Sequence, residues 1–192
     1  MFIGCNDVNV WCKKMNNKIQ VIDNFLDKES FNKIHEAMFS SFFPWYYHDY
    51  VDYDSKQEKN NPKKFQFVHI FYESYKGNLN ASDGFRLLQP VIQKLDVVTL
   101  IRIKSNLLTN QNEIIQNEFH RDYTHLKDYE NAKTAILYMN TNNGKTIFEE
   151  DGTEIDSVAN RMVIFHPNMK HTGTTCTDQK ARVVINFNYY IR

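Results

Sequence analysis

A short stretch of the chain, residues 118–125 (EFHRDYTH), places an imidazole and a carboxylate two positions apart. If this stretch is extended, His120 and Asp122 face the same side, because successive side chains of a strand alternate. Alone the pair is a weak signal, since a histidine satisfied by a nearby aspartate is common. A further histidine, His171, lies 49 positions after Asp122 (171 − 122 = 49). Two histidines and one carboxylate form the facial triad that binds non-haem Fe(II) and leaves positions open for a chelating cosubstrate and dioxygen.

An arginine, Arg182, follows His171 by 11 positions (182 − 171 = 11), across what the sequence predicts to be a hairpin. A dicarboxylic cosubstrate that chelates the metal through its 2-oxo acid end leaves its other carboxylate buried, and a buried carboxylate requires a partner. The guanidinium of Arg182 offers a planar fork of fixed charge for that carboxylate. The residues therefore predict a metal centre with an arginine that holds an organic acid beside it.

Other histidines compete for these positions. His166, five residues before His171, is the main rival for the third ligand, and we favour a loop position for it or a role in orienting a ligand. His125 is out of phase with His120 and is expected to face solvent or to bond a neighbouring loop. The remaining histidines are expected in structural or surface positions: His35 on a helix surface, His48 and His69 as satisfied histidines of aromatic strands.

The elements that must position these side chains are short β-branched or aromatic runs in the second half of the chain. Strands are predicted at 97–108, 134–140, 145–151, 161–167 and 181–191, separated by turn signals such as NTNNG and EEDG. The first half predicts helices. One helix is expected within 23–41, after Asp27 as N-cap, and a second from 83 to 96 with Pro90 near its first turns.

Between the two predicted helices, 64–75 alternates apolar residues and is predicted as a strand. The aromatic run 42–53 is predicted as a strand or an extended cover over the core, with packing favoured over a substrate groove. The charged run 54–64 is predicted as an exposed loop. Like 107–118, it is placed where a flanking loop can close over substrate. Helices followed by many strands favour an α+β chain whose last hundred residues form a sandwich or jelly roll.

Length and composition set the limits. A chain of 192 residues and 22.8 kDa predicts one domain with a real hydrophobic core. Lys+Arg and Asp+Glu balance at 23 each, which gives no long-range attraction to nucleic acid. No apolar run approaches the roughly 18 residues of a membrane span. Three cysteines, Cys5, Cys12 and Cys176, match no common zinc pattern and are expected as reduced thiols, so we predict a cytoplasmic protein.

These motifs also resemble a known family. The resemblance lies in FHRD (119–122), TAILYMN (134–140), NGKTIF (143–148), NRMVIF (160–165), HTG (171–173) and RVVIN (182–186). They resemble the 2-oxoglutarate and Fe(II)-dependent oxygenases, and within that superfamily the chain is most similar to the prolyl 4-hydroxylase-like proteins of bacteria and marine phages. The resemblance covers roughly residues 98–190. It implies an α+β, mainly β fold, with a double-stranded β-helix (jelly-roll) core and N-terminal helices packed on one sheet.

The resemblance implies roles for individual residues. His120, Asp122 and His171 would hold the metal, and Arg182 would bind the C5 carboxylate of 2-oxoglutarate. Many relatives carry a tyrosine before the H-x-D motif that shares the cosubstrate. In this chain the preceding strand instead carries Arg102, Lys104 and Asn106 in alternation. One of these, or Tyr138 on the next strand, would take the role of that tyrosine, and we select Asn106 and Tyr138 as cosubstrate-binding candidates.

The implied function is a 2-oxoglutarate-dependent dioxygenase that hydroxylates a C–H bond and converts 2-oxoglutarate to succinate. Its cofactors would be Fe(II), 2-oxoglutarate and O₂, with ascorbate open as an addition. The expected substrate is a peptide, with a prolyl or other amino-acid residue favoured, or a small molecule.

The expected architecture is one domain over 1–192, with a support at 1–96 and the core at 97–192. The expected location is the cytoplasm, or a host cytoplasm for a phage-encoded protein, and the oligomeric state stays open. Two alternatives are a non-catalytic metal-binding jelly roll and a metal-dependent hydrolase.

Overall fold

The computed structural model describes residues 19–51, 61–75, 77–122 and 130–192. Cys5, Cys12 and His125, together with most of the loop predicted at 54–64, lie outside these residues. The third cysteine, Cys176, is buried as a free thiol. Within the described ranges, no helix has both the length and the apolar character needed to cross a membrane.

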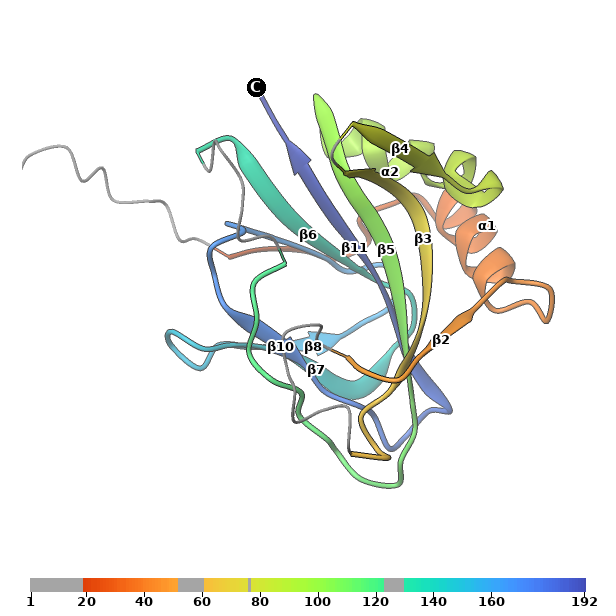
Figure 1. Cartoon of the computed structure of the whole chain (residues 1–192), viewed down its shortest axis with the longest axis vertical. Helices are drawn as coiled ribbons and strands as arrows, with labels where there is room; N and C mark the ends of the chain where they lie inside the picture. The colour runs from red at the N-terminus through yellow and green to blue at the C-terminus, as the bar shows by residue number, and fades with distance from the viewer. Residues whose placement is uncertain (1–18, 52–60, 76, 123–129) are drawn as a thin grey trace, which may run out of the picture.

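Two antiparallel sheets form the body of the protein (Figure 1). In the described part of the chain the large sheet has eight strands, ordered β1-β9-β6-β11-β5-β3-β2, with β4 also paired to β3. Its strands are β1 (Gln20–Ile22), β2 (Tyr46–His48), β3 (Gln66–Tyr75), β4 (Asn78–Ala81), β5 (Thr99–Thr109), β6 (Ala132–Tyr138), β9 (Met162–Phe165) and β11 (Ala181–Tyr190). The small sheet, β10-β7-β8, consists of β7 (Asn142–Phe148), β8 (Glu154–Ser157) and β10 (His171–Gly173). The predicted mainly β, jelly-roll fold class is thereby confirmed.

The centre of the large sheet separates an apolar face from a polar one. Strands β5 and β11 pair antiparallel along ten residues of β11, and successive side chains alternate between the faces. On β11, Val183, Ile185, Phe187 and Tyr189 enter the core cluster that includes the helices, whereas Arg182, Val184 and Asn186 line a cavity on the other face. Alternate residues of β11 therefore contribute to the core on one face and to a polar cavity on the other.

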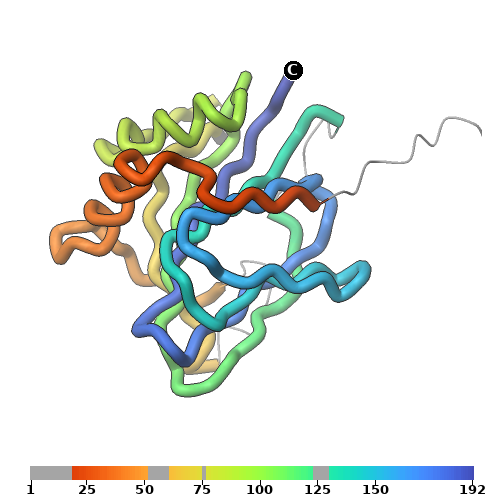
Figure 2. Tube along the Cα trace, turned by 180° about the vertical axis from the view of Figure 1, so that it is seen from behind, coloured from red at the N-terminus to blue at the C-terminus, as the bar shows by residue number. Residues whose placement is uncertain are grey.

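The apolar face is covered by helices, which Figure 1 shows on one side of the large sheet. Helix α1 (Lys28–Met38) starts where the sequence predicts, because the Asp27 side chain accepts a hydrogen bond from the Ser30 N–H at 2.9 Å. Its buried residues Phe31, Ile34 and Met38 share one core cluster with residues of β5, β6 and β11. Figure 2 follows the chain from β1 into α1 along the back of the molecule.

The second predicted helix divides into two. Residues Asp83–Leu88 form a 3₁₀ helix, η2, and only Gln89–Lys94 form the α-helix, α2. Pro90 marks the division, because proline has no N–H to donate to a preceding helical turn and is tolerated only in the first turn of an α-helix. Leu88, Val91 and Leu95 still bury their side chains, so the predicted apolar stripe is retained.

The small sheet packs against the polar face through a second apolar cluster, in which Phe148 and Ile155 meet Tyr138, Val163 and Phe165 of the large sheet. Two predictions about it were wrong. The NTNNG turn signal at 140–144 falls largely inside β7, and residues 149–151, predicted as strand, form the following turn. The short strands β8 and β10 were not predicted, because three or four residues carry too little periodicity to be recognised.

Candidate metal centre

The two histidines of the predicted triad meet across an isolated antiparallel bridge. The N–H of His120 donates to the carbonyl of His171 at 3.0 Å, and the N–H of His171 donates to the carbonyl of His120 at 3.0 Å. The bridge lies on the edge of β10 opposite to β7 and brings together residues that are 51 positions apart (171 − 120 = 51). The ring centroids lie 4.9 Å apart. The extended geometry expected at 118–122 is therefore present as this single bridge and not as a regular strand.

Asp122 completes the cluster. One ligand atom from each of His120, Asp122 and His171 lies within 4.8 Å of the others, and this is the single cluster of potential metal ligands found among the described residues. The Oδ1 atom of Asp122 faces Nε2 of His120 at 3.8 Å. The structure thus brings together the three residues selected from the sequence, at a separation that small side-chain rotations can bridge around one ion.

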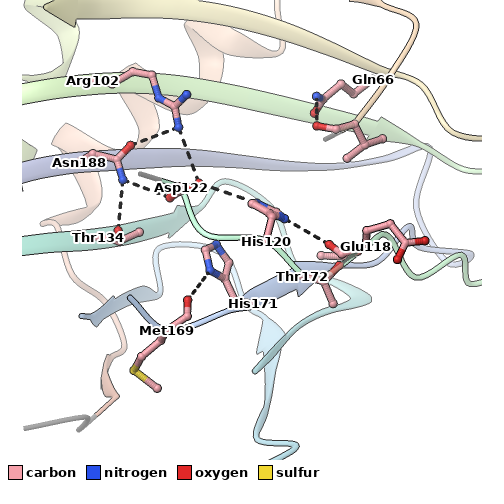
Figure 3. A network of polar contacts seen from close by, with 12 residues as sticks. Gln66, Arg102, Glu118, His120, Asp122, Thr134, Met169, His171, Thr172 and Asn188 are labelled. Carbon is pink, nitrogen blue, oxygen red and sulfur yellow. Dashed lines mark hydrogen bonds and ion pairs between the residues drawn. The ribbon is translucent and has the colours of Figure 1, made fainter. Parts of the chain in front are cut away.

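Backbone carbonyls orient both imidazole rings, as Figure 3 shows. Nδ1 of His120 lies 3.2 Å from the carbonyl of Glu118, and Nδ1 of His171 lies 3.2 Å from the carbonyl of Met169. A carbonyl only accepts, so each Nδ1 carries the proton. Each Nε2 is then left as a lone-pair donor, which is the arrangement that metal-binding histidines use.

The charges of the cluster suit a divalent cation at neutral pH. Burial acts to raise the pKa of Asp122, but His171, Arg102, His120 and a hydrogen bond from Asn188 outweigh it and lower that pKa to about 2. Burial lowers the pKa of His171 to about 4, against the attraction of Asp122. The site therefore presents one carboxylate and a neutral His171 imidazole, the protonation states that metal ligands require.

A buried arginine lies in the same cavity. Arg182 is 4% exposed; its Nε donates to Ser157 Oγ at 2.8 Å, and its Nη2 donates to Thr146 Oγ1 at 2.9 Å. Burial lowers the pKa of Arg182, but a guanidinium stays protonated in proteins. Among the described residues no carboxylate lies within ion-pair distance of it. A buried cation held by two hydroxyls is incompletely compensated, and an anion entering the cavity would complete its coordination.

Two glycines make room for this guanidinium. A Cβ on Gly173 would lie 2.9 Å from Nη1 of Arg182, and a Cβ on Gly144 would lie 2.7 Å from its Cδ and 2.7 Å from the carbonyl of Thr175. Gly144 belongs to the NTNNG turn signal, but it lies inside β7 without positive φ, and close approach is the reason for it. The small sheet is thus fitted around the arginine.

The cavity runs from Arg182 to the metal cluster and is lined mainly by polar side chains of β5 and β11. Asn106 and Asn186 are part of this wall, and the Oδ1 atom of each is buried without a hydrogen-bond partner. Unpaired buried amide oxygens are rare in proteins and indicate a missing ligand or water. The cavity therefore combines a His-Asp-His cluster with a buried guanidinium that contacts no described carboxylate, and this pairing suits a chelating dicarboxylate.

The second cosubstrate candidate is placed differently. Tyr138 is fully buried and does not line the cavity. Its hydroxyl donates to Thr146 Oγ1 at 2.7 Å, and the guanidinium of Arg182 lies 5.5 Å from its ring centroid. Tyr138 is therefore behind the cavity wall, where it supports Arg182 and Thr146.

The other histidines take structural positions. Nδ1 of His166 accepts the Asn168 N–H at 3.2 Å, which places this rival in a turn and outside the ligand cluster. His69 is buried between the Pro44 carbonyl and the Ser82 hydroxyl, at 3.0 and 2.9 Å, as expected for a satisfied histidine. His48 departs from that expectation, because its buried Nδ1 has no hydrogen-bond partner. His35, expected on a surface, is partly buried and stacks on Phe39 at 4.3 Å.

Four residues around the site were not selected from the sequence: Thr146, Ser157, Asn186 and Asn188. Thr146 and Ser157 hold Arg182, Asn186 lines the cavity, and Asn188 contacts Asp122. For two of them a signal was present. Arg182, Val184, Asn186 and Asn188 alternate with apolar residues along one strand, so Asn186 and Asn188 share the face of the arginine.

If the cavity binds 2-oxoglutarate, as the sequence resemblance implies, Gly173→Ala should weaken that binding by about 10- to 100-fold, because the new Cβ displaces Nη1 of Arg182 and small misplacements at a site can cost two orders of magnitude. Isothermal titration with 2-oxoglutarate in the presence of Mn(II) measures this. The Mn(II) dissociation constant of the same variant is the internal control and should stay near that of the parent protein. An unchanged 2-oxoglutarate affinity would contradict the assigned role of the glycine.

Comparison with known proteins gives structural matches only. A scan against protein-family models finds no match, and a search of curated proteins finds none. Among solved structures the chain is similar to an oxidoreductase of the 2OG-Fe(II) oxygenase family from Burkholderia pseudomallei, with a TM-score of 0.64 and 11% identity over 90% of this chain and 84% of that chain.

Two further structures show the range of proteins with this fold. One is a prolyl hydroxylase from Trichoplax adhaerens in complex with a hypoxia inducible factor peptide fragment, with a TM-score of 0.59 and 12% identity over 91% of this chain and 84% of that chain. Another is the epimerase SnoN in complex with Fe³⁺, alpha ketoglutarate and nogalamycin RO, with a TM-score of 0.58 and 12% identity over 92% of this chain and 80% of that chain. The chain has the fold of the 2-oxoglutarate and Fe(II)-dependent oxygenases, a fold that includes prolyl hydroxylases.

Proposed function

We propose that this protein is a dioxygenase that uses Fe(II) and 2-oxoglutarate to hydroxylate a C–H bond of its substrate. The observation that carries the proposal is Arg182, a buried guanidinium that contacts hydroxyls but no described carboxylate and lies in the same cavity as a His-Asp-His cluster. A metal-binding site alone would not require that cation. The pairing of a chelation site with an anion site across one cavity is specific to a substrate with two acidic ends.

Each residue has a separate task in this proposal. His120, Asp122 and His171 hold the iron through Nε2, a carboxylate oxygen and Nε2, and Arg182 binds the C5 carboxylate of 2-oxoglutarate. Asn106, which lines the cavity, donates its side-chain NH₂ to the cosubstrate, and Tyr138 acts only through Arg182. Bound Fe(II) and 2-oxoglutarate would together supply the oxidative chemistry, which couples conversion of 2-oxoglutarate to succinate with oxidation of a C–H bond by O₂.

The substrate that we favour is a peptidyl proline or another amino-acid residue, with a small molecule as the alternative. The fold occurs in a prolyl hydroxylase with a bound peptide and in an epimerase with a small natural product, so the fold supports both classes and selects neither. We further propose that residues 1–192 act as one domain and that the protein works in a cytoplasm.

The test begins with binding and ends with turnover. Under anaerobic conditions 2-oxoglutarate should bind only when Fe(II) or Mn(II) is present, since one end of it chelates the metal. On admission of O₂ to the Fe(II) form, succinate release should follow and should rise with the correct member of a panel of peptides and metabolites. Absence of metal-dependent 2-oxoglutarate binding would overturn the proposal and would favour a metal-dependent hydrolase. Tight binding without succinate formation across the whole panel would favour a non-catalytic module.

A further inference from the structure

Three residues on neighbouring strands form a polar row beside Asp122 of the His-Asp-His cluster. In the register of the large sheet, Asn188 of β11 lies opposite Arg102 of β5 on one side and opposite Thr134 of β6 on the other. The pairing of β11 with β5 shifts register immediately after Asn188. Such irregularities re-aim side chains near functional sites. The row therefore lies next to an irregularity in the pairing of β11 with β5.

Every hydrogen-bonding atom of the Asn188 amide is used. Its Nδ2 donates to Asp122 Oδ2 at 3.1 Å and to Thr134 Oγ1 at 3.2 Å, and its Oδ1 accepts from Arg102 Nη2 at 3.4 Å (Figure 3). The opposite orientation of the amide would place its oxygen against the carboxylate and its NH₂ against the guanidinium. The neighbours thus fix which way the amide points, and Asn188 itself is 1% exposed.

The two oxygens of Asp122 consequently differ. Oδ2 is engaged by Asn188, whereas Oδ1 is directed toward His120 Nε2 at 3.8 Å and has Arg102 Nη2 at 3.7 Å. A free carboxylate can rotate and bind a cation through both oxygens. Here one oxygen is held by the sheet, so the other is the one presented to an ion.

We propose that Asn188 is a positioning residue that, together with Arg102 and Thr134, holds Asp122 as a one-oxygen metal ligand. The inference deepens the proposed function at the same site, but it concerns metal binding and is independent of turnover. Holding Oδ2 leaves a coordination position free that a two-oxygen carboxylate would occupy, and that position is needed for a chelating cosubstrate.

The test measures Co(II) affinity by absorption titration in the parent protein, in Asn188→Ala and in Asn80→Ala, which makes the same change on the exposed strand β4. Loss of an outer hydrogen bond to a metal ligand typically costs 10- to 100-fold in affinity. We expect a loss of about that size for Asn188→Ala, with an altered Co(II) spectrum, and no change for Asn80→Ala. A cooperative thermal transition verifies that each variant is folded, and Thr134→Val, which frees only the second amide proton, should give a smaller loss.

A double-mutant cycle separates positioning from a structural effect. If Asn188 acts through Asp122, adding Asn188→Ala to Asp122→Ala should change the Co(II) affinity less than twofold. An equal loss in both backgrounds, or parent-like affinity and spectrum in the single variant, would overturn the proposal. Failure of the oxygenase proposal would appear instead as a protein that loses Co(II) affinity in Asn188→Ala as expected but binds no 2-oxoglutarate.

Discussion

Replacing Asp122 with alanine should abolish succinate formation and weaken Fe(II) binding by well over the roughly 100-fold that loss of an outer hydrogen bond costs. Asp122 supplies the only carboxylate of the cluster found among the described residues, and its pKa of about 2 keeps it charged at neutral pH. Without it the two imidazoles offer no charge to balance the cation. Anaerobic Fe(II) titration and quantification of succinate measure the two effects.

The fold should survive this substitution. Asp122 lies outside the strands, and the apolar clusters on both faces of the large sheet do not include it. We therefore expect a cooperative thermal transition in Asp122→Ala. Asp156→Ala, at an exposed carboxylate of β8, is the matched control and should retain metal binding. Normal succinate production by Asp122→Ala would refute the assignment of the metal centre.

Replacing Arg182 with methionine should remove the 2-oxoglutarate affinity while leaving the metal affinity almost unchanged. Truncating one member of a buried, hydrogen-bonded charge pair costs about 2–5 kcal/mol, which corresponds to roughly a 30- to 4,000-fold rise in the dissociation constant. Isothermal titration with Mn(II) and 2-oxoglutarate measures the loss. Arg86→Met, at an exposed arginine, should bind 2-oxoglutarate like the parent protein.

The thermal stability of the same variant distinguishes a ligand-binding arginine from a structural one. Without ligand, Arg182 is a buried cation that contacts the hydroxyls of Ser157 and Thr146 and the ring of Tyr138 but no described carboxylate, so an apolar side chain of similar length should cost little stability. We expect 2-oxoglutarate with Mn(II) to raise the midpoint of unfolding of the parent protein but not that of Arg182→Met. A large loss of stability in the ligand-free variant, with 2-oxoglutarate affinity retained, would assign Arg182 to the core instead.

Local patterns determined much of the fold without help from the tertiary structure. The capping pair of Asp27 and Ser30 and the apolar spacing of 31, 34 and 38 predicted α1, since both act within a few residues of the chain. The long strands β3, β5, β6 and β11 were also predicted, because each spans several two-residue periods of side-chain alternation. The residue types of the candidate triad and of Arg182 were likewise available from their order alone.

The tertiary structure decided what depends on partners remote in sequence. Strand β10 exists because it pairs with β7 along one edge and with His120 on the other, and three residues carry no pattern of their own. Gly144 is needed inside a strand because the Arg182 side chain passes over it. Neither contact has a local signal.

Asn188 is the clearest case of this limit. Its three partners are 54, 66 and 86 positions away, so its sequence neighbours predict only a residue of an alternating strand. Side-chain type and local spacing determine what chemistry a residue can perform, because they act within one element. Which oxygen of Asp122 accepts from Asn188, and which guanidinium in the cavity contacts no described carboxylate, depends on the folded arrangement of the strands, and that geometry exists only in the folded chain.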